Sequence, residues 1–66
     1  MIINRVRMES AAGWYLGSIE FVEDEAQPYD RHSLYYPSEE WLKREFPRSI
    51  SLKDAFDRGM ARYKLR

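Results

Sequence analysis

The sequence predicts an α+β domain in which a three-stranded antiparallel sheet is followed by two short helices packed on one face of the sheet. Two observations support this fold class. Alternating apolar residues and aromatic, β-branched runs fill the first half of the chain, whereas helix-start signals and four-residue apolar spacings fill the second half. Strands that precede the helices, instead of alternating with them, are typical of an antiparallel sheet with its helices to one side. We therefore expect the order βββαα in a single domain of residues 1–66.

The first two strands are expected to form a hairpin. Over residues 2–8 the side chains alternate with the period of two that a half-buried strand shows. One side of this strand carries Ile2, Asn4, Val6 and Met8, and the other carries Ile3, Arg5 and Arg7. The small residues at 10–13 predict a turn. Residues 14–22 are rich in aromatic and β-branched residues on both sides, which places the second strand at the centre of the sheet.

The third strand is expected after an acidic loop. Residues 23–30 predict a solvated loop, because they contain little apolar surface and a proline. The acidic residues of this loop are Glu23, Asp24, Glu25 and Asp30. A short β-favouring run at 33–36 then predicts the third strand, which Pro37 ends.

Two helices are expected in the second half. Ser38 is a suitable N-cap for a helix over 39–46, which ends at Phe46 because Pro47 disfavours helical backbone at the preceding residue. Ser51 is a suitable cap for a second helix that runs to about residue 64. Gly59 indicates a close approach of this helix to the sheet. The apolar stripe of the second helix consists of Leu52, Phe56, Met60 and Tyr63. We expect the core to contain Trp14, Phe21, Leu52, Phe56 and Met60.

Composition limits how such a domain is stabilised. A chain of 66 residues gains only about 3–5 kcal/mol from a single core. It contains no cysteine and one histidine, so disulfides and structural zinc cannot supplement that core. Aromatic side chains take over this role, and a two-fold homodimer is left open as a further source of burial. The absence of cysteine favours a cytoplasmic location, and no apolar run approaches the roughly 18 residues of a membrane span.

The residue types present give little support for a catalytic site or a metal site. His32 would have to serve any nucleophilic site alone, and the chain has no cysteine, no threonine and no Gly-x-Ser-x-Gly motif. The acidic run 23–25 lacks the alternating spacing and the glycine of a calcium loop. Gly13 and Gly17 enclose large side chains, which would keep a phosphate away from the backbone. We expect no enzyme, no cofactor and no metal.

Charge is balanced overall, with 11 basic and 11 acidic residues, but it is unevenly distributed. Residues 23–30 carry −4 and residues 31–66 carry +4. Arg58, Arg62 and Arg66 recur every four residues, so they form a basic stripe suited to phosphate contacts. This favours, as the alternative function, a nucleic-acid-binding module whose strand aromatics stack on bases. A solvated helix face on which Asp54 pairs with Arg58 explains the same stripe.

The aromatic residues support the leading hypothesis, a non-enzymatic interaction protein. A domain of this size cannot bury all of its tyrosines and tryptophans, and both types are enriched where proteins meet. Neighbouring acidic side chains would orient the bound partner. The residues expected to bind it are Tyr29, Tyr35, Tyr36 and Trp41, flanked by Glu23, Asp24 and Glu25.

Two segments also carry a resemblance. Residues 13–18, Gly-Trp-Tyr-Leu-Gly-Ser, and residues 28–40, Pro-Tyr-Asp-Arg-His-Ser-Leu-Tyr-Tyr-Pro-Ser-Glu-Glu, are similar to a pattern in small uncharacterised proteins of bacteria, phages and mobile elements. In such proteins a hairpin is followed by a short capped helix. The resemblance implies no activity and no catalytic residue. It implies an accessory protein that binds and inhibits a host protein, for example a CRISPR or other defence component.

Overall fold

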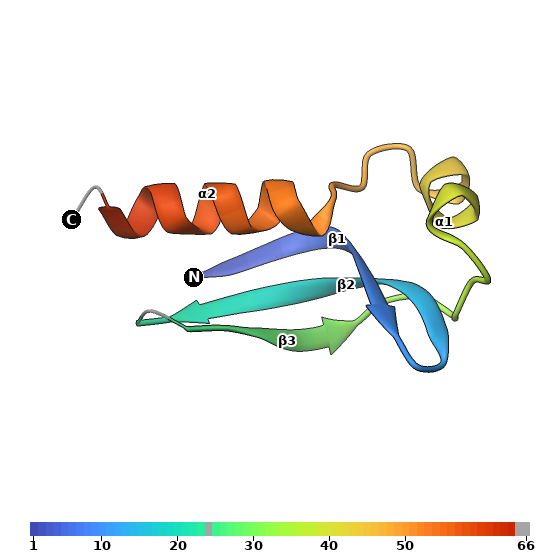
Figure 1. Ribbon diagram of the computed structural model, residues 1–66, viewed down its shortest axis with the longest axis horizontal. Helices are drawn as coiled ribbons and strands as arrows, with labels where there is room; N and C mark the ends of the chain where they lie inside the picture. Colours follow the sequence, from blue (N-terminus) through green and yellow to red (C-terminus); the bar gives the residue numbers. More distant parts are fainter. Residues whose placement is uncertain (24, 65–66) are drawn as a thin grey trace.

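The computed structural model describes residues 1–23 and 25–64, with side chains described as far as residue 61. Its elements are β1 (Ile2–Ser10), β2 (Gly13–Val22), β3 (Glu25–Arg31), α1 (Glu39–Glu45) and α2 (Leu52–Lys64). The strands form one antiparallel sheet in the order β1-β2-β3, and both helices follow it in the chain (Figure 1). The predicted α+β class and the βββαα order are confirmed.

A β-bulge in β1 changes which of its side chains face the core. The register with β2 shifts between Ile3 and Val6, and Arg5 within the bulge has a positive φ of 59°. An extra residue reverses the alternation of side chains beyond it. Ile3 therefore packs on the same side as Val6 and Met8. The prediction that Ile2 shares the face of Val6 and Met8 is wrong, and Ile2 is 42% exposed.

The third strand lies earlier in the chain than predicted. β3 occupies most of the predicted acidic loop, whereas within the predicted strand 33–36 only Tyr36 pairs, through an isolated bridge to Trp14. Glu23 forms the tight turn after β2 with a positive φ of 57°. The prediction failed because an exposed edge strand needs no apolar alternation and tolerates Pro28.

The core lies between the sheet and α2. Its buried residues are Val6, Met8, Ile19, Phe21 and Ala55. α2 approaches the sheet through its smallest residues, because Ala55 is fully buried and a Cβ added at Gly59 would lie 2.3 Å from Cζ of Phe21. The close approach predicted from Gly59 is confirmed.

The predicted apolar stripe of α2 does not face the core. Leu52, Phe56 and Met60 are 39%, 38% and 41% exposed. Residues three apart on an α-helix differ by about 60° in direction. Because Ala55 and Gly59 face the sheet, the apolar stripe lies on the flank of the helix. Phe56 keeps only an edge-on contact with the Phe21 ring, at 5.9 Å between centroids. The side chain of Tyr63 lies outside the described residues, and Trp14 is half-buried.

A buried arginine connects β1 to the first residue of α1 and to the segment that follows α1. Arg7 is 8% exposed and points to the opposite side of β1 from its neighbours Val6 and Met8. Its Nε donates to Glu39 Oε2 at 3.2 Å, and its Nη1 donates to the carbonyl and the hydroxyl of Ser49, each at 2.8 Å. α2 thus lies on one face of the sheet, whereas α1 is attached through a side chain that leaves from the other face.

The two edges of the sheet differ. Ile50 runs beside the outer edge of β1, where its amide donates to the Arg5 carbonyl at 2.8 Å and its carbonyl accepts from the Arg7 amide at 2.9 Å. Within the described ranges, no segment pairs with the outer edge of β3. β3 is therefore the open edge of the sheet.

Candidate functional site

Tyr35 is held at the surface by two neighbours. Its ring packs edge-on against Tyr15 at a centroid distance of 5.7 Å, and the Arg31 guanidinium lies 4.8 Å from the Tyr35 ring centroid. Arg31 also donates from Nη1 to the Ser33 carbonyl at 2.7 Å. A guanidinium over an aromatic face is attracted to it. Tyr15 and Arg31 therefore fix a ring that is 46% exposed.

The segment that carries Tyr35 is tied to β2 and presents a leucine to solvent. The His32 amide donates to the Leu16 carbonyl, and the Leu16 amide donates to Ser33 Oγ, both at 2.8 Å. Leu34, one residue further on, is 79% exposed. Leu34 was not among the predicted partner-binding residues, because residues 33–36 were predicted to form a strand. The one sequence feature that could have indicated its exposure is its position directly after the polar run Asp-Arg-His-Ser.

Tyr29 lies at the irregularity in β3. Ser18 pairs with Asp30 and Ile19 pairs with Pro28, which leaves Tyr29 without a partner in β2. A bulge of this kind re-aims a side chain, and Tyr29 is 57% exposed. We define the aromatic surface as Tyr29, Arg31, Leu34 and Tyr35.

The two remaining predicted aromatics are placed differently. Tyr36 is half-buried, because its backbone exchanges hydrogen bonds with Trp14 at 2.8 and 2.6 Å and its ring packs edge-on against Phe46 at 6.2 Å. Tyr36 is therefore less exposed than Tyr29, Tyr35 and Trp41. Trp41 is 52% exposed on α1, where Ser38 Oγ accepts from its amide at 3.2 Å. Within the described part of the chain, Trp41 makes no ring contact with the aromatic surface.

The predicted acidic residues lie at the other end of β3. Glu23 is exposed in the turn, Glu25 is exposed at the start of β3, and Asp24 lies outside the described residues. A strand rises about 3.3 Å per residue, so Glu25 and Tyr29 are separated by about 13 Å along β3. The structure therefore does not bring Glu23 and Glu25 next to the aromatic surface.

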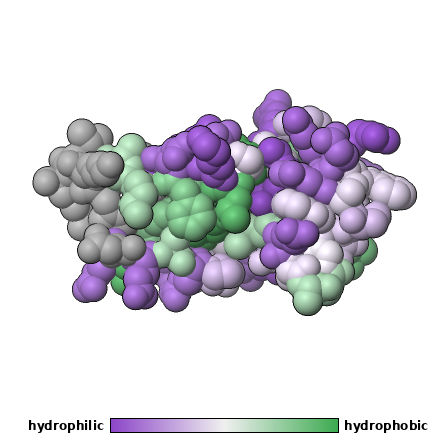
Figure 2. All heavy atoms as spheres, viewed as in Figure 1, coloured by the Kyte–Doolittle hydropathy of each residue, from purple (hydrophilic) through white to green (hydrophobic). Residues whose placement is uncertain are grey.

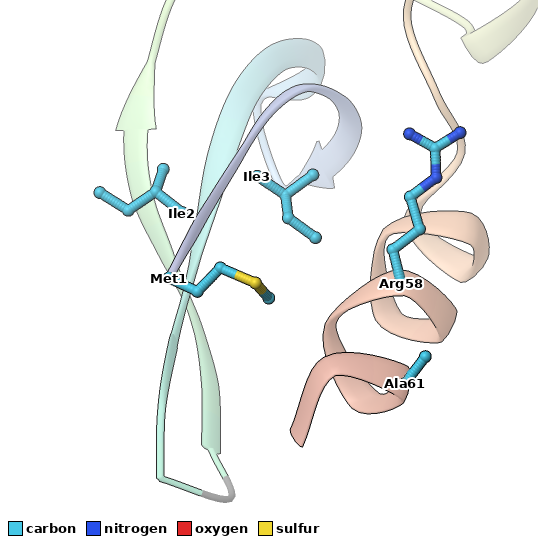
Figure 3. Close-up of a pocket in the computed structure, with 5 residues that line it drawn as sticks. All are labelled: Met1, Ile2, Ile3, Arg58 and Ala61. Carbon is cyan, nitrogen blue, oxygen red and sulfur yellow. The ribbon is translucent and has the colours of Figure 1, made fainter. Parts of the chain in front are cut away.

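Only part of the predicted basic stripe is described. Arg58 is exposed, whereas the side chain of Arg62 and all of Arg66 lie outside the described residues. A hollow beside α2 is lined by Met1, Ile2, Ile3, Arg58 and Ala61. Met1 and Ile3 extend toward α2, and Ile2 points away (Figure 3). Among the described residues that line this hollow, Arg58 is the one with a basic side chain.

A second hydrophobic surface lies between α2 and β3, and we call it the α2–β3 groove. It is lined by Met8, Glu9, Ile19, Ala26, Gln27, Pro28, Leu52 and Phe56. Hydrophobic side chains gather between α2 and the strands (Figure 2). The groove was not predicted from the sequence, because the apolar stripe of α2 was expected to lie in the core.

Ser18 and His32 approach each other without forming a nucleophile and its base. Ser18 Oγ lies 2.7 Å from His32 Nε2 and donates to Asn4 Oδ1 at 2.8 Å. A hydroxyl has one proton, so Nε2 of His32 is the donor to Ser18. Ser18 is 1% exposed, which closes its oxygen to a substrate. These residues form a hydrogen-bond network that links β1, β2 and the end of β3.

Metal sites and membrane spans were sought in the same residues. No cluster of three or more histidine or acidic side chains that could hold a metal ion occurs among the residues described. In that part of the chain, no helix has both the length and the apolar character needed to cross a membrane.

Comparisons with protein-family models, with curated proteins and with solved structures gave no match to the chain. The resemblance to small proteins of bacteria, phages and mobile elements therefore stays a prediction. Function has to be argued from the geometry of the two hydrophobic surfaces.

Proposed function

We propose that this chain is an interaction protein that binds a larger protein through the aromatic surface, with Trp41 as a second anchor. The proposal rests on the ring of Tyr35, which is 46% exposed and is nevertheless held in place by Tyr15 and Arg31. Binding through a side chain that is already ordered loses little conformational entropy. Tyrosine and arginine are also the residue types that dominate the energetics of protein interfaces.

Leu34 adds apolar area to this surface. Complete burial of a leucine side chain contributes about 1.5–3 kcal/mol relative to exposure. Because Leu34 is 79% exposed, nearly all of that contribution is available to a partner. A pocket that receives Leu34 beside the Tyr35 ring is therefore the complement we expect on the bound protein.

The test is affinity capture with matched variants. Tagged wild-type protein, Leu34→Ser, Tyr35→Ala and the control Val22→Ser are each incubated with nuclease-treated lysate of the host cell. Val22 is a suitable control because it is 49% exposed on β2 and lies outside the aromatic surface. A protein retained in stoichiometric amount by wild type and Val22→Ser, and lost with Leu34→Ser and Tyr35→Ala, supports the proposal. If no captured protein follows this profile, the proposal fails.

A finer proposal is that binding inhibits a defence component of the host, and it rests on the resemblance alone. Expression of the chain should then raise the plating efficiency of a phage on cells with an active CRISPR system. Leu34→Ser should abolish this effect, and Val22→Ser should preserve it. Equal plating with and without the wild-type chain argues against inhibition of that system while leaving the binding proposal intact.

Nucleic-acid binding is the competing outcome. The Arg58 side chain lies on a helix that also carries Asp54 and Asp57, and the net charge of the chain is zero. Wild-type protein that shifts single- or double-stranded oligonucleotides at low salt, with loss of the shift in Arg58→Gln, would favour this alternative. Unchanged mobility of the oligonucleotides favours the protein partner.

A further inference from the structure

The α2–β3 groove exists because a single helix covers a sheet that is wider than the helix. α2 packs most closely on β1, at one side of the sheet (Figure 1). Neighbouring strands lie about 4.8 Å apart, so β3 is about 10 Å from β1, which is the diameter of a helix with its side chains. The apolar face of β3, represented by Ala26 and Pro28, consequently lies beside α2 and not beneath it.

The exposed flank of α2 that borders this groove has an internal symmetry. Leu52 and Phe56 line the groove, and Met60 follows them on the same flank, four residues after Phe56. All three are between 38% and 41% exposed. The flank next to them carries opposite charges, because Lys53 Nζ binds Asp57 Oδ2 at 3.2 Å with both side chains largely in solvent. In a second copy of the helix that runs antiparallel to the first, a large apolar residue therefore takes the position of another large apolar residue. A basic side chain likewise lies near the position of an acidic one.

We propose that this flank of α2 packs against the same flank of α2 in a second copy of this chain, related by a two-fold axis near Phe56. In this arrangement the two helices run antiparallel, the Phe56 side chains meet at the axis, and Leu52 of each copy lies opposite Met60 of the other. At a rise of about 1.5 Å per residue, Lys53 of one copy is displaced only about 3 Å along the helix from Asp57 of the other. A two-fold interface requires this kind of self-complementary patch.

The size of the molecule fits the same arrangement. A standard interface covers about 800 Å² on each partner. The molecule extends over 38 × 20 × 15 Å and has a total accessible surface of 5006 Å², so an interface of that size would cover about a sixth of it. A chain with so small a core gains proportionally more from such burial than a larger domain does.

The first test is sedimentation equilibrium of wild type, Phe56→Lys and the control Ile2→Lys. Ile2 is 42% exposed, close to the 38% of Phe56, and points away from α2. We expect a reversible wild-type dimer, an unchanged dissociation constant for Ile2→Lys, and a rise on the order of a hundredfold for Phe56→Lys. Wild-type protein that stays monomeric up to about 1 mM, or equal effects of the two substitutions, would overturn the proposal.

The second test separates contacts between copies from contacts within a helix. Lys53→Asp gives a chain with two acidic residues at these positions, and Asp57→Lys gives a chain with two basic ones, so each variant repels its own copies. Mixed in equal amounts, the two variants should form a one-to-one heterodimer at least as tight as the wild-type dimer, although neither regains its internal pair. A mixture that stays monomeric while each variant is folded would exclude the antiparallel α2 contact.

The dimer and the proposed partner binding are tested on different residues. The dimer uses the flank of α2, whereas partner capture depends on Leu34 and Tyr35. Loss of dimerisation in Phe56→Lys with retained capture would show two separate surfaces. Loss of both would show that the partner depends on the dimer.

Discussion

One side of α2 carries small residues and the other carries large ones. The side toward the sheet presents Ala55 and Gly59, while the exposed flank presents Leu52, Phe56 and Met60. Hydrophobicity alone would turn the larger side chains inward. The comparison shows that closeness of approach decides the orientation, because the buried Phe21 ring occupies the space above the sheet and only a residue without a side chain fits over it.

The largest expected effect on stability distinguishes Phe21 of β2 from Phe56 of α2, whose rings are in contact. Phe21 is 2% exposed and Phe56 is 38% exposed. Phe21→Ala should lower the free energy of unfolding by about 3–5 kcal/mol, because it opens a cavity in the core. That loss equals the stability expected of the whole chain, so this variant should be unfolded in water.

Phe56→Ala is the matched control. Measured by urea unfolding followed by circular dichroism at a protein concentration low enough for the monomer, it should lower the free energy of unfolding by less than half as much as Phe21→Ala. Equal losses for the two variants would mean that both sides of α2 belong to the core.

The next effect concerns the close approach itself. Gly59→Val should destabilise the fold by about 3 kcal/mol, because its Cβ would enter the Phe21 ring and the core has to move apart. Ala61→Val, on an exposed position of the same helix, should change the free energy of unfolding by about 0.5 kcal/mol. The melting temperatures of the two variants check this, and a Gly59→Val protein as stable as wild type would contradict the packing described.

A smaller effect distinguishes how the two helices are attached. α2 is held by apolar contact, whereas α1 adds the hydrogen bonds of Arg7 to Glu39 and Ser49 to the burial of its Leu42. Arg7→Met keeps the buried volume but leaves the Ser49 carbonyl unpaired, so it should cost about 1–3 kcal/mol. Arg44→Met, on an exposed position of α1, serves as the control, and equal unfolding free energies for both variants would show that Arg7 does not anchor α1.

The smallest effect is expected at the aromatic surface. Leu34→Ser should change the free energy of unfolding by no more than about 0.5 kcal/mol, because Leu34 is mostly in solvent. Urea unfolding checks this value. A loss well above 1 kcal/mol would indicate that Leu34 serves the fold, and its role in partner binding would need another variant to test it.

The sequence was most informative where local chemistry decides the structure. The caps at Ser38 and Ser51 and the hairpin turn were predictable, because each depends on residues a few positions apart. The bulge at Arg5 and the edge strand β3 were not predictable. Both depend on pairing with β2, and an exposed edge strand leaves no apolar pattern by which to recognise it.

The candidate surfaces were predicted only in part. Tyr29, Tyr35 and Trp41 lie exposed as expected, because large aromatics exceed what so small a core can bury. Tyr36 is held inward by its backbone pairing with Trp14, a contact between distant segments that no local pattern encodes. The groove escaped prediction for a related reason, since an apolar stripe shows which residues share a helix flank but not which flank faces the sheet.

The orientation of α2 is tested most directly by NMR with a soluble gadolinium chelate, which broadens protons that solvent reaches. In dilute protein we predict strong broadening of the Phe56 ring and the Met60 methyl group, and protection of the Phe21 ring and the Ala55 methyl group. As the protein concentration rises, Phe56 and Met60 should become protected while Ile2 stays broadened. Protection of Phe56 and Met60 at every concentration would contradict the account, because those side chains would then belong to the core of the monomer.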